Sequence, residues 1–466
     1  MSSVFVHIGQ CGNQIGQEFW RKTSVVAEKD FNVKRAFCTP GGAGRDKEGH
    51  MRAVFVDSEK KVLQRLLKSF KTGKKATSFQ FGYANVISCA KGCGSNWSLG
   101  YNRMPEEKVM NPWSTNTYSY SHEFDYGSED SILKSSMEAI RREVEACDSF
   151  SGFVIFHSLA GGTGSGFGAR ICAELRDRYP VAYQLSVTVA PHSSGECPTQ
   201  PYNELLCLAG LQQDCDGIIM FENDEVLDSI SRSSTSATSA VSLTQMNSYI
   251  ADCISNLLRP VSSLTPPNGV TVGIEPWELI RSVSPMHPMK LLNCRTVQEK
   301  QNASRPSTKS SSWPELSKKL CQGARTKFLQ TKSQYGIDDS TSAAVCVCRN
   351  ATKSKRSDTN NIDVANLASR LKNSYNCVTW NPFPIDVWVA EKPEVNTDAT
   401  KSLTVCANIT SLGTVHCANL LHSARRKFEA KAYLHWYERY GTYHSDFENA
   451  FDIVHNIVKE YEKAAA

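Results

Sequence analysis

The chain has 466 residues, long enough for two or three domains with an ample core, and its formal net charge is +5. Basic residues are scattered through both halves, and no dense lysine and arginine stripe indicates a nucleic-acid partner. No apolar run reaches membrane-spanning length, and the 17 cysteines follow no secretory signal. Neither Cys89 with Cys93 nor Cys346 with Cys348 has a second pair at zinc-finger spacing. We therefore expect a soluble cytosolic protein with reduced thiols.

The first residues predict a strand, because apolar side chains alternate over residues 4–8. The run Gly-Gln-Cys-Gly-Asn-Gln follows at once over residues 9–14, and apolar residues then recur at helical spacing. This is a strand–glycine–helix junction whose backbone amides could face a phosphate. Gln10 and Gln14 are one helical turn apart and could reach the same ligand. Alternatively, they are exposed side chains beside a tight turn.

A polar stretch with clustered glycines, residues 28–50, is interpreted as a surface loop. Residues 52–57 then predict a second strand, with Asp57 and Glu59 at its carboxyl end. Carboxylates in this place, beside phosphates, suit a hydrated Mg²⁺, and they would equally favour the N-terminus of a helix. Residues 92–97 form a third glycine-rich loop.

Residues 101–126 are low in aliphatic side chains and rich in serine, asparagine and tyrosine, which indicates an insertion on the surface. Glu129 and Asp130 then open a predicted helix with one apolar face. This helix leads into residues 152–159, an apolar run that predicts a buried strand.

The segment Ala160-Gly161-Gly162-Thr163-Gly164-Ser165-Gly166 follows that strand, and a helix is predicted from Phe167. A glycine loop between a strand and a helix N-terminus is a ready anion site, since glycines allow close backbone approach and hydroxyls add donors. An ordinary glycine-rich connection is the alternative. The segment lacks the lysine of a Walker A loop and the spacing of a nucleophile elbow. It also lacks the G-x-G-x-x-G turn that a dinucleotide-dependent oxidoreductase needs.

Strands and helices alternate further along the chain. Strands are predicted at 183–189 and 217–221 with a helix near 202–212 between them, which favours a parallel sheet covered on both faces. A long helical stretch follows and ends before Pro260. The pattern is weak from residue 288 to about 401, apart from strands at 343–348 and 386–390, and residues 411–466 are predicted to be helical.

Three strings in this chain resemble signatures of the tubulin family. They are G-Q-C-G-N-Q-I-G at 9–16, A-G-G-T-G-S-G at 160–166, with alanine in place of the first glycine, and K-A-Y-L-H-W-Y at 431–437. The resemblance covers the whole chain and is strongest over 1–260 and 420–450. Residues 145–153 together with 160–166 resemble the delta type. The alpha and beta types would end in an acidic tail, whereas this chain ends K-E-Y-E-K-A-A-A, so recognition by motors through such a tail is not expected.

The resemblance implies an α/β fold of the tubulin kind. A Rossmann-type parallel sheet would form a GTP-binding domain over residues 1–222. A core helix and a smaller mixed α+β intermediate domain would follow over 223–410, and a C-terminal helical hairpin region over 411–466.

The resemblance also implies a site for GTP or GDP with Mg²⁺. Glu59 would hold the water shell of Mg²⁺, and Asn223 and Asn247 would read the guanine with their amide groups. The remaining residues around the nucleotide and its phosphates would be Gln10, Cys11, Gln14, Gly94, Ser95, Ser158, Ala160, Gly161, Gly162, Thr163, Gly164, Ser165 and Gly166.

Three positions depart from the family's pattern. Leu243 stands where an aromatic side chain often stacks on the base, Gln200 where a glutamate binds the ribose, and Ser95 where an asparagine lies near the phosphates. We expect GTP binding to survive these changes, with less stacking energy.

In this family hydrolysis requires an acidic residue from the next subunit, which orients or deprotonates water in line with the γ-phosphate. Glu278 aligns with that residue, and Glu275 is the alternative. The implied function is that of a structural and assembly component of centrioles and basal bodies, within the cytoplasmic cytoskeleton, that supports triplet microtubules. Other tubulins would be its partners, epsilon-tubulin above all. A non-polymerising GTP-binding scaffold of the same fold is the alternative.

Overall fold

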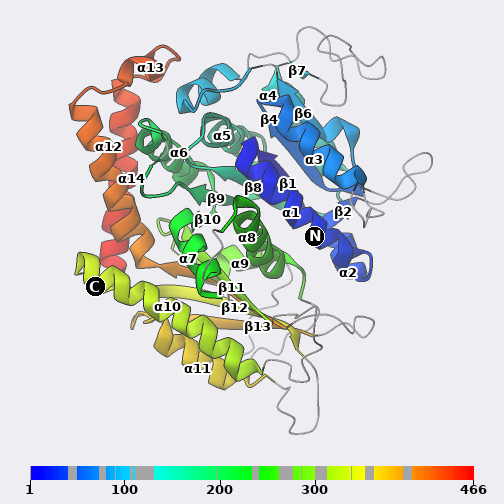
Figure 1. Ribbon diagram of the computed structural model, residues 1–466, viewed down its shortest axis with the longest axis vertical. Coiled ribbons are helices and arrows are strands. Elements are labelled where there is room, and N and C mark those ends of the chain that lie inside the picture. The colour runs from blue at the N-terminus through cyan, green and yellow to red at the C-terminus, as the bar shows by residue number, and fades with distance from the viewer. Residues whose placement is uncertain are drawn as a thin grey trace.

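One large sheet forms the centre of the molecule (Figure 1), and within the described residues it has 11 strands in the order β13-β12-β14-β11-β10-β9-β8-β1-β4-β6-β7. The computed structural model describes residues 2–39, 50–72, 80–89, 91–104, 109–110, 131–195, 197–233, 241–261, 276–284, 286–299, 312–336, 338–351, 362–391 and 401–465. The strands of this sheet are β1 Ser2–Ile8, β4 Ala53–Asp57, β6 Val86–Cys89, β7 Val109–Met110, β8 Phe150–Ser158, β9 Tyr183–Ala190, β10 Gly217–Glu222, β11 Leu291–Gln298, β12 Thr341–Ala351, β13 Ile385–Glu391 and β14 Ser402–Ile409. A small second sheet contains β2 Cys38–Thr39, β3 His50–Met51 and β5 Gln80–Phe81.

Helices surround the large sheet. The α-helices are α1 Gly9–Ala27, α2 Phe31–Phe37, α3 Lys60–Thr72, α4 Ile132–Glu145, α5 Gly168–Arg178, α6 Gln200–Asp214, α7 Asn223–Ser233, α8 Leu243–Leu258, α9 Pro276–Val283, α10 Trp313–Tyr335, α11 Val364–Ser374, α12 Ala418–Glu429, α13 Leu434–Glu438 and α14 His444–Ala465. Short π-helical turns lie at Leu99–Arg103, Gly162–Phe167 and Leu412–Cys417.

The order of the parallel strands reverses between β1 and β8. β1 pairs in parallel with both β4 and β8, and the chain then adds β6 beyond β4 on one side and β9 and β10 beyond β8 on the other. In open α/β sheets such a switch point leaves a crevice at the carboxyl ends of the strands, where ligands bind. The fold therefore places a crevice where β1 ends at Ile8 and β8 ends at Ser158.

Both faces of this sheet are covered by helices, as the alternation of strand and helix predicts. Along β1, Val4 and Val6 belong to one buried core and Phe5 to the other, because successive side chains of a strand point to opposite faces. Helices α1, α3 and α8 supply apolar residues to the core around Phe5. Helices α4, α5, α6, α12 and α14 supply them to the other core. The predicted α/β fold class, with a mainly parallel sheet covered on both faces, is confirmed.

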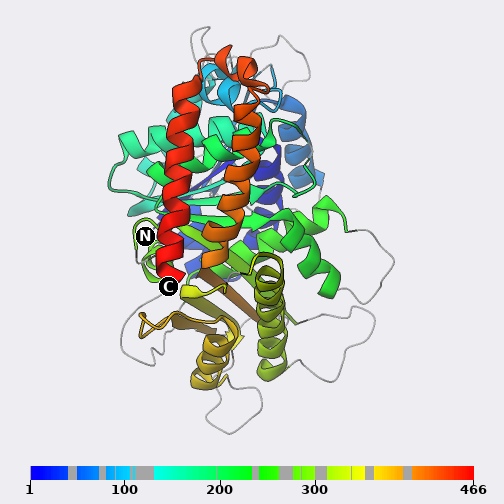
Figure 2. The same ribbon diagram turned by 90° about the vertical axis from the view of Figure 1, so that its left-hand side faces the viewer.

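The predicted helical C-terminus is also confirmed. Helices α12 and α14 run side by side along one flank of the molecule (Figure 2). The hydroxyl of Tyr461 accepts a hydrogen bond from the backbone N–H of Leu291 at 2.9 Å and donates one to its carbonyl at 3.1 Å, which ties α14 to β11. β10 ends at Glu222 and pairs with β11, so the sheet continues past the predicted domain boundary at residue 222. The division into domains at this residue stays a prediction.

The prediction of a surface loop over residues 28–50 is wrong. Helix α2 and the short strands β2 and β3 lie there, while residues 40–49 are outside the described part of the chain. The carboxylate of Asp30 caps α2 by accepting from the backbone N–H groups of Asn32 and Val33. Val33 and Phe37, one turn apart, are buried. Phe31 and Ala36 are the other apolar residues of α2, but only Val33 and Phe37 are buried, and so short an apolar pattern in a polar stretch is too weak to indicate a helix.

The weak pattern between residues 288 and 401 conceals two helices, α10 and α11. Ser312 and Glu315 form a capping box at the start of α10, a signal that the sequence contains. The long helical stretch predicted after Asn223 is divided into α7 and α8, with residues 234–240 outside the described residues. The predicted insertion is described only at 101–104 and 109–110.

No helix in the described part of the chain is both long and apolar enough to cross a membrane. All 17 cysteines are free thiols.

A buried arginine from β12 caps the C-terminus of α8. The Arg349 guanidinium donates from Nε to the carbonyl of Asn256 at 2.6 Å, from Nη1 to that of Pro260 at 3.1 Å, and from Nη2 to that of Arg259. Only 5% of Arg349 is exposed. A cation at a helix C-terminus is favourable, and here it satisfies carbonyls that the end of α8 leaves without intrahelical partners. This contact anchors α8 to the sheet beyond β11.

Replacing Arg349 with methionine keeps much of the side-chain volume but removes the donors at the end of α8. We expect Arg349→Met to lower the free energy of unfolding by about 2–4 kcal/mol, because buried carbonyls lose their hydrogen bonds. Urea titration followed by tryptophan fluorescence measures the change. The control is Arg426→Met, at an exposed position on α12. If both variants unfold at the same urea concentration, the guanidinium does not anchor α8.

Candidate nucleotide-binding site

Two helix N-termini meet at the switch point of the sheet. Helix α1 begins at Gly9, directly after β1, and the π-helical turn Gly162–Phe167 begins shortly after β8. Gly9 has a positive φ of 72° and packs so closely that a Cβ on it would lie 2.9 Å from the backbone nitrogen of Gly164. Only glycine fits such a contact without displacing its neighbour. Both N-termini carry unpaired N–H groups and partial positive charge, so the place between them favours an anion.

The glycine segment is more helical than its sequence predicts. Instead of an open loop with a helix from Phe167, the π-helical turn already starts at Gly162, and α5 continues it from Gly168. The glycines serve close packing: a Cβ on Gly162 would lie 2.7 Å from that of Cys93. The predicted hydroxyl donors already have partners, since Thr163 Oγ1 lies 2.6 Å from Ser58 Oγ and Ser165 donates to the carbonyl of Gly161. Ala160 and Gly161 precede the turn.

The side chain of Asn203 links the loop with Gly94 and Ser95 to the same glycine segment. Asn203 was not among the site residues predicted from the sequence. The amide of Asn203 donates to the carbonyl of Ser95 at 2.7 Å and to that of Ala160 at 2.8 Å. Its oxygen accepts from the hydroxyl of Tyr437 at 2.6 Å. Asn203 is fully buried in α6. The sequence did contain a signal for this role, namely an asparagine within an apolar helical run, because a buried amide needs hydrogen-bond partners.

The end of β4 supplies two carboxylates in different surroundings. Asp57 is buried and accepts from the side-chain amide of Asn13 at 3.3 Å and from the backbone N–H of Glu59 at 3.1 Å. Burial raises the pKa of Asp57 to about 7. Glu59 is exposed, and its Oε1 lies 3.6 Å from where a Cβ on Gly92 would stand. Of the two, Glu59 is the carboxylate that is open to a hydrated cation.

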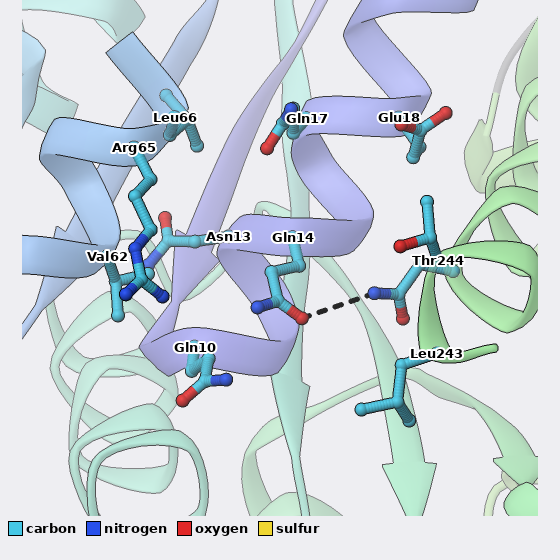
Figure 3. A pocket seen from close by; sticks show the side chains of 11 residues that line it. Gln10, Asn13, Gln14, Gln17, Glu18, Val62, Arg65, Leu66, Leu243 and Thr244 are labelled. Carbon is cyan, nitrogen blue, oxygen red and sulfur yellow. Dashed lines mark hydrogen bonds between the residues drawn. The ribbon is translucent and has the colours of Figure 1, made fainter. Parts of the chain in front are cut away.

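A cavity of about 360 Å³ lies between α1, α3 and α8 (Figure 3). It brings together three of the predicted residues, Gln10, Gln14 and Asn247, and the Nδ2 of Asn247 donates to Oε1 of Gln14 at 3.2 Å. This bond leaves Asn247 Oδ1 to accept and Gln14 Nε2 to donate. Guanine offers an amino donor and a carbonyl acceptor, which such a pair of amides matches.

Of the positions that depart from the family's pattern, Leu243 lies at this cavity and Gln200 lies outside it. Leu243, at the start of α8, lines the cavity, and as an aliphatic side chain it offers a base no aromatic ring to stack on. Gln200 begins α6 and donates from Nε2 to the carbonyl of His192 at 3.3 Å. Cys11 is half-buried beside Gln10, and burial raises the pKa of its thiol to about 12. The thiol is therefore neutral and can contact a ligand without adding charge.

Asn223 and Glu278 are among the predicted residues that do not line this cavity. Asn223 begins α7 at the end of β10, at the same edge of the sheet, but it does not line the cavity with Asn247. Glu278 lies in the first turn of α9. Its neighbour Trp277 stacks on Tyr183 with ring centroids 5.9 Å apart, and Tyr183 is the first residue of β9.

Glu278 therefore lies at the opposite edge of the sheet from the glycine segment. Tyr183 pairs with Gly152, whereas Ser158 pairs with Val189 at the far end of the same strand. At about 3.3 Å per residue the two ends are on the order of 20 Å apart.

Comparison with known proteins gives one consistent result. Residues 2–112 and 113–231 match the Tubulin/FtsZ family, GTPase domain. The chain is 27% identical to the tubulin delta chain of Homo sapiens over 99% of both chains, and 26% identical to that of Mus musculus over the same share of each. It is 30% identical to the tubulin epsilon chain of Mus musculus over 49% of this chain and 46% of that protein. Together with the parallel sheet and the glycine segment at its switch point, these matches lead to one conclusion: the chain belongs to the tubulin family.

Proposed function

We propose that the protein is a GTP-binding tubulin of the delta type, a structural and assembly component of centrioles and basal bodies that supports triplet microtubules. The observation that carries the nucleotide part is the meeting of two helix N-termini, at Gly9 and Gly162, at the switch point of a parallel sheet. The resemblance to tubulin delta chains over nearly the whole length supports the assignment of type.

In this proposal GTP or GDP lies across the edge of the sheet. The phosphates rest between the first turn of α1 and the segment Ala160–Gly166, near Ser158, Gly94 and Ser95. The base lies toward α8, where Gln14 presents a donor and Asn247 an acceptor, and Asn223 approaches from the end of β10. Mg²⁺, held through water by Glu59, would neutralise phosphate charge.

The proposed partners are other tubulins, and epsilon-tubulin first among them. Tubulin-family proteins belong to the cytoplasmic cytoskeleton, and association with centrioles and basal bodies is the finer proposal. Head-to-tail association is favoured by the place of Glu278, at the edge of the sheet opposite the nucleotide. Only a neighbouring subunit could bring this carboxylate to a γ-phosphate, through a heterologous contact.

The first prediction concerns base selectivity. GTP and GDP should displace a fluorescent guanine nucleotide from the protein, while ATP should not. Asn223→Asp should weaken guanine binding by about 1–3 kcal/mol, because a donor to the base becomes an acceptor. The control Asn366→Asp adds the same charge at an exposed position of α11. Equal competition by ATP would remove the assignment of these amides.

The second prediction uses two glycines of the same segment. A Cβ on Gly164 would lie 2.4 Å from Ser158 Oγ, whereas one on Gly161 would meet nothing closer than 3.5 Å. Gly164→Val should therefore abolish nucleotide retention through purification, and Gly161→Ala should keep it. Circular dichroism on the same samples separates this effect from loss of the fold. A folded Gly164→Val protein that retains stoichiometric nucleotide would show that the segment does not hold the phosphates.

The third prediction concerns hydrolysis in trans. Phosphate release per chain should rise with protein or partner concentration, because each active centre needs a neighbour's Glu278. Glu278→Gln should slow turnover by about 10²-fold with unchanged binding, since it removes a general base. Glu429→Gln, at an exposed position on α12, is the control. A rate per chain that is independent of dilution would rule out this mechanism, and no release at all would favour the non-polymerising scaffold.

A further inference from the structure

Six charged side chains form a partly buried network that joins distant parts of the chain. Its carboxylates are Glu204 of α6, Glu222 of β10 and Glu225 of α7. Its cations are Arg295 of β11, Lys327 of α10 and His416 of the π-helical turn Leu412–Cys417. We call these six residues the ion network.

The contacts run in an unbroken series. His416 lies between two carboxylates, with Nε2 2.9 Å from Oε1 of Glu204 and Nδ1 3.0 Å from Oε1 of Glu222. Lys327 Nζ is 3.1 Å from Oε2 of Glu222 and 2.5 Å from Oε2 of Glu225. Arg295 Nε completes the series, 2.6 Å from Oε1 of Glu225.

The charges in the ion network balance. Burial alone would lower the pKa of His416, but hydrogen bonds to Glu204 and Glu222 raise it to about 10, so the ring is an imidazolium at neutral pH. Burial opposes ionisation of Glu222 as well, yet Lys327 and His416 hold its pKa well below the usual range. Three carboxylates therefore face three cations. All six side chains line a cavity of about 470 Å³, but because they are paired with one another the network presents no unbalanced charge to a ligand there.

The ion network encloses the first turn of α7, where Asn223 lies. Glu222 immediately precedes Asn223, and Glu225 is two residues beyond it. The intervening Asp224 is held separately, because its Oδ1 is 2.6 Å from Nδ1 of His192 and its Oδ2 accepts from the backbone N–H of Ser193 at 2.9 Å. Breaking one buried ion pair leaves an uncompensated charge, which is strongly unfavourable. The backbone around Asn223 is thus fixed from both sides.

We propose that the ion network positions Asn223 for the guanine base. Recognition of the base is thereby coupled to the packing of α10 and of the π-helical turn Leu412–Cys417 against the sheet edge at which the nucleotide would lie. This inference rests on the proposed function. Asn223 would contact the base, and the network residues are positioning residues. Coupling of this kind is reciprocal, so whatever displaces α10 also changes the affinity for guanine.

The test compares GTP with 2-aminopurine riboside triphosphate, whose base keeps the amino group of guanine but lacks the O6 acceptor for the amide of Asn223. Lys327→Gln should reduce the preference for GTP by about 5- to 10-fold while changing the affinity for 2-aminopurine riboside triphosphate less than about twofold. Lys327→Arg should restore the preference, because it keeps the charge. The control is Lys332→Gln on the same helix, where Lys332 forms an exposed pair with Asp338. A preference that Lys327→Gln leaves unchanged would overturn the inference.

Hydrogen exchange on the unmodified protein tests the same coupling without any substitution. GTP should protect the amides of residues 313–327 and 412–417 more strongly than saturating 2-aminopurine riboside triphosphate does. Equal protection by the two nucleotides would overturn the inference. Failure of the proposed function has a different signature, namely a wild-type protein that does not prefer GTP to ATP.

Discussion

The contact between Gly9 and Gly164 holds two helix N-termini against each other at the edge of the parallel sheet. Because β1 and β8 are adjacent and parallel, α1 and the π-helical turn begin at the same edge of the sheet, with their unpaired N–H groups close together. Two partial positive charges at this distance repel each other in the absence of a counter-charge. A phosphate between them relieves that repulsion and satisfies the N–H groups. Anion binding is thus a consequence of the topology before any side chain is considered.

Side chains then determine which anion fits. The amides of Gln14 and Asn247 orient each other through one hydrogen bond, which fixes the donor and acceptor that the cavity presents. Because Leu243 has no aromatic ring, a guanine base in this cavity would gain little from stacking, and more of its recognition would depend on hydrogen bonds. A polar site of this kind discriminates by leaving unmatched partners in the wrong complex. In the proposed mechanism, the place of Glu278 at the opposite edge of the sheet would separate binding from hydrolysis and make subunit contact the condition for turnover.

The features that could be predicted from the sequence are those that depend on residues adjacent in the chain. The strand at residues 4–8, the helix after Gly9 and the buried strand before Ala160 each follow from the pattern of adjacent residues, and the resemblance in those segments identifies the family. Helix α2 was missed because only Val33 and Phe37 indicate it. The helical geometry of Gly162–Phe167 could not be predicted, because glycine disfavours a helix and the segment packs closely against residues elsewhere in the chain, such as Cys93. The roles of Asn203 and of the ion network depend on contacts with residues far away in the chain, such as Tyr437 and His416.

The central claim is that the switch point of this sheet holds a guanine nucleotide, and the most direct test identifies what the protein carries. Protein purified without added nucleotide is denatured in acid, and the released small molecules are separated by ion-pair chromatography. Our account predicts guanine nucleotide, GDP or GTP, in roughly stoichiometric amount, because a site built from two helix N-termini and a matched pair of amides retains its ligand. Release of adenine nucleotide instead, or of no nucleotide from folded protein that also fails to bind added GTP, would contradict it.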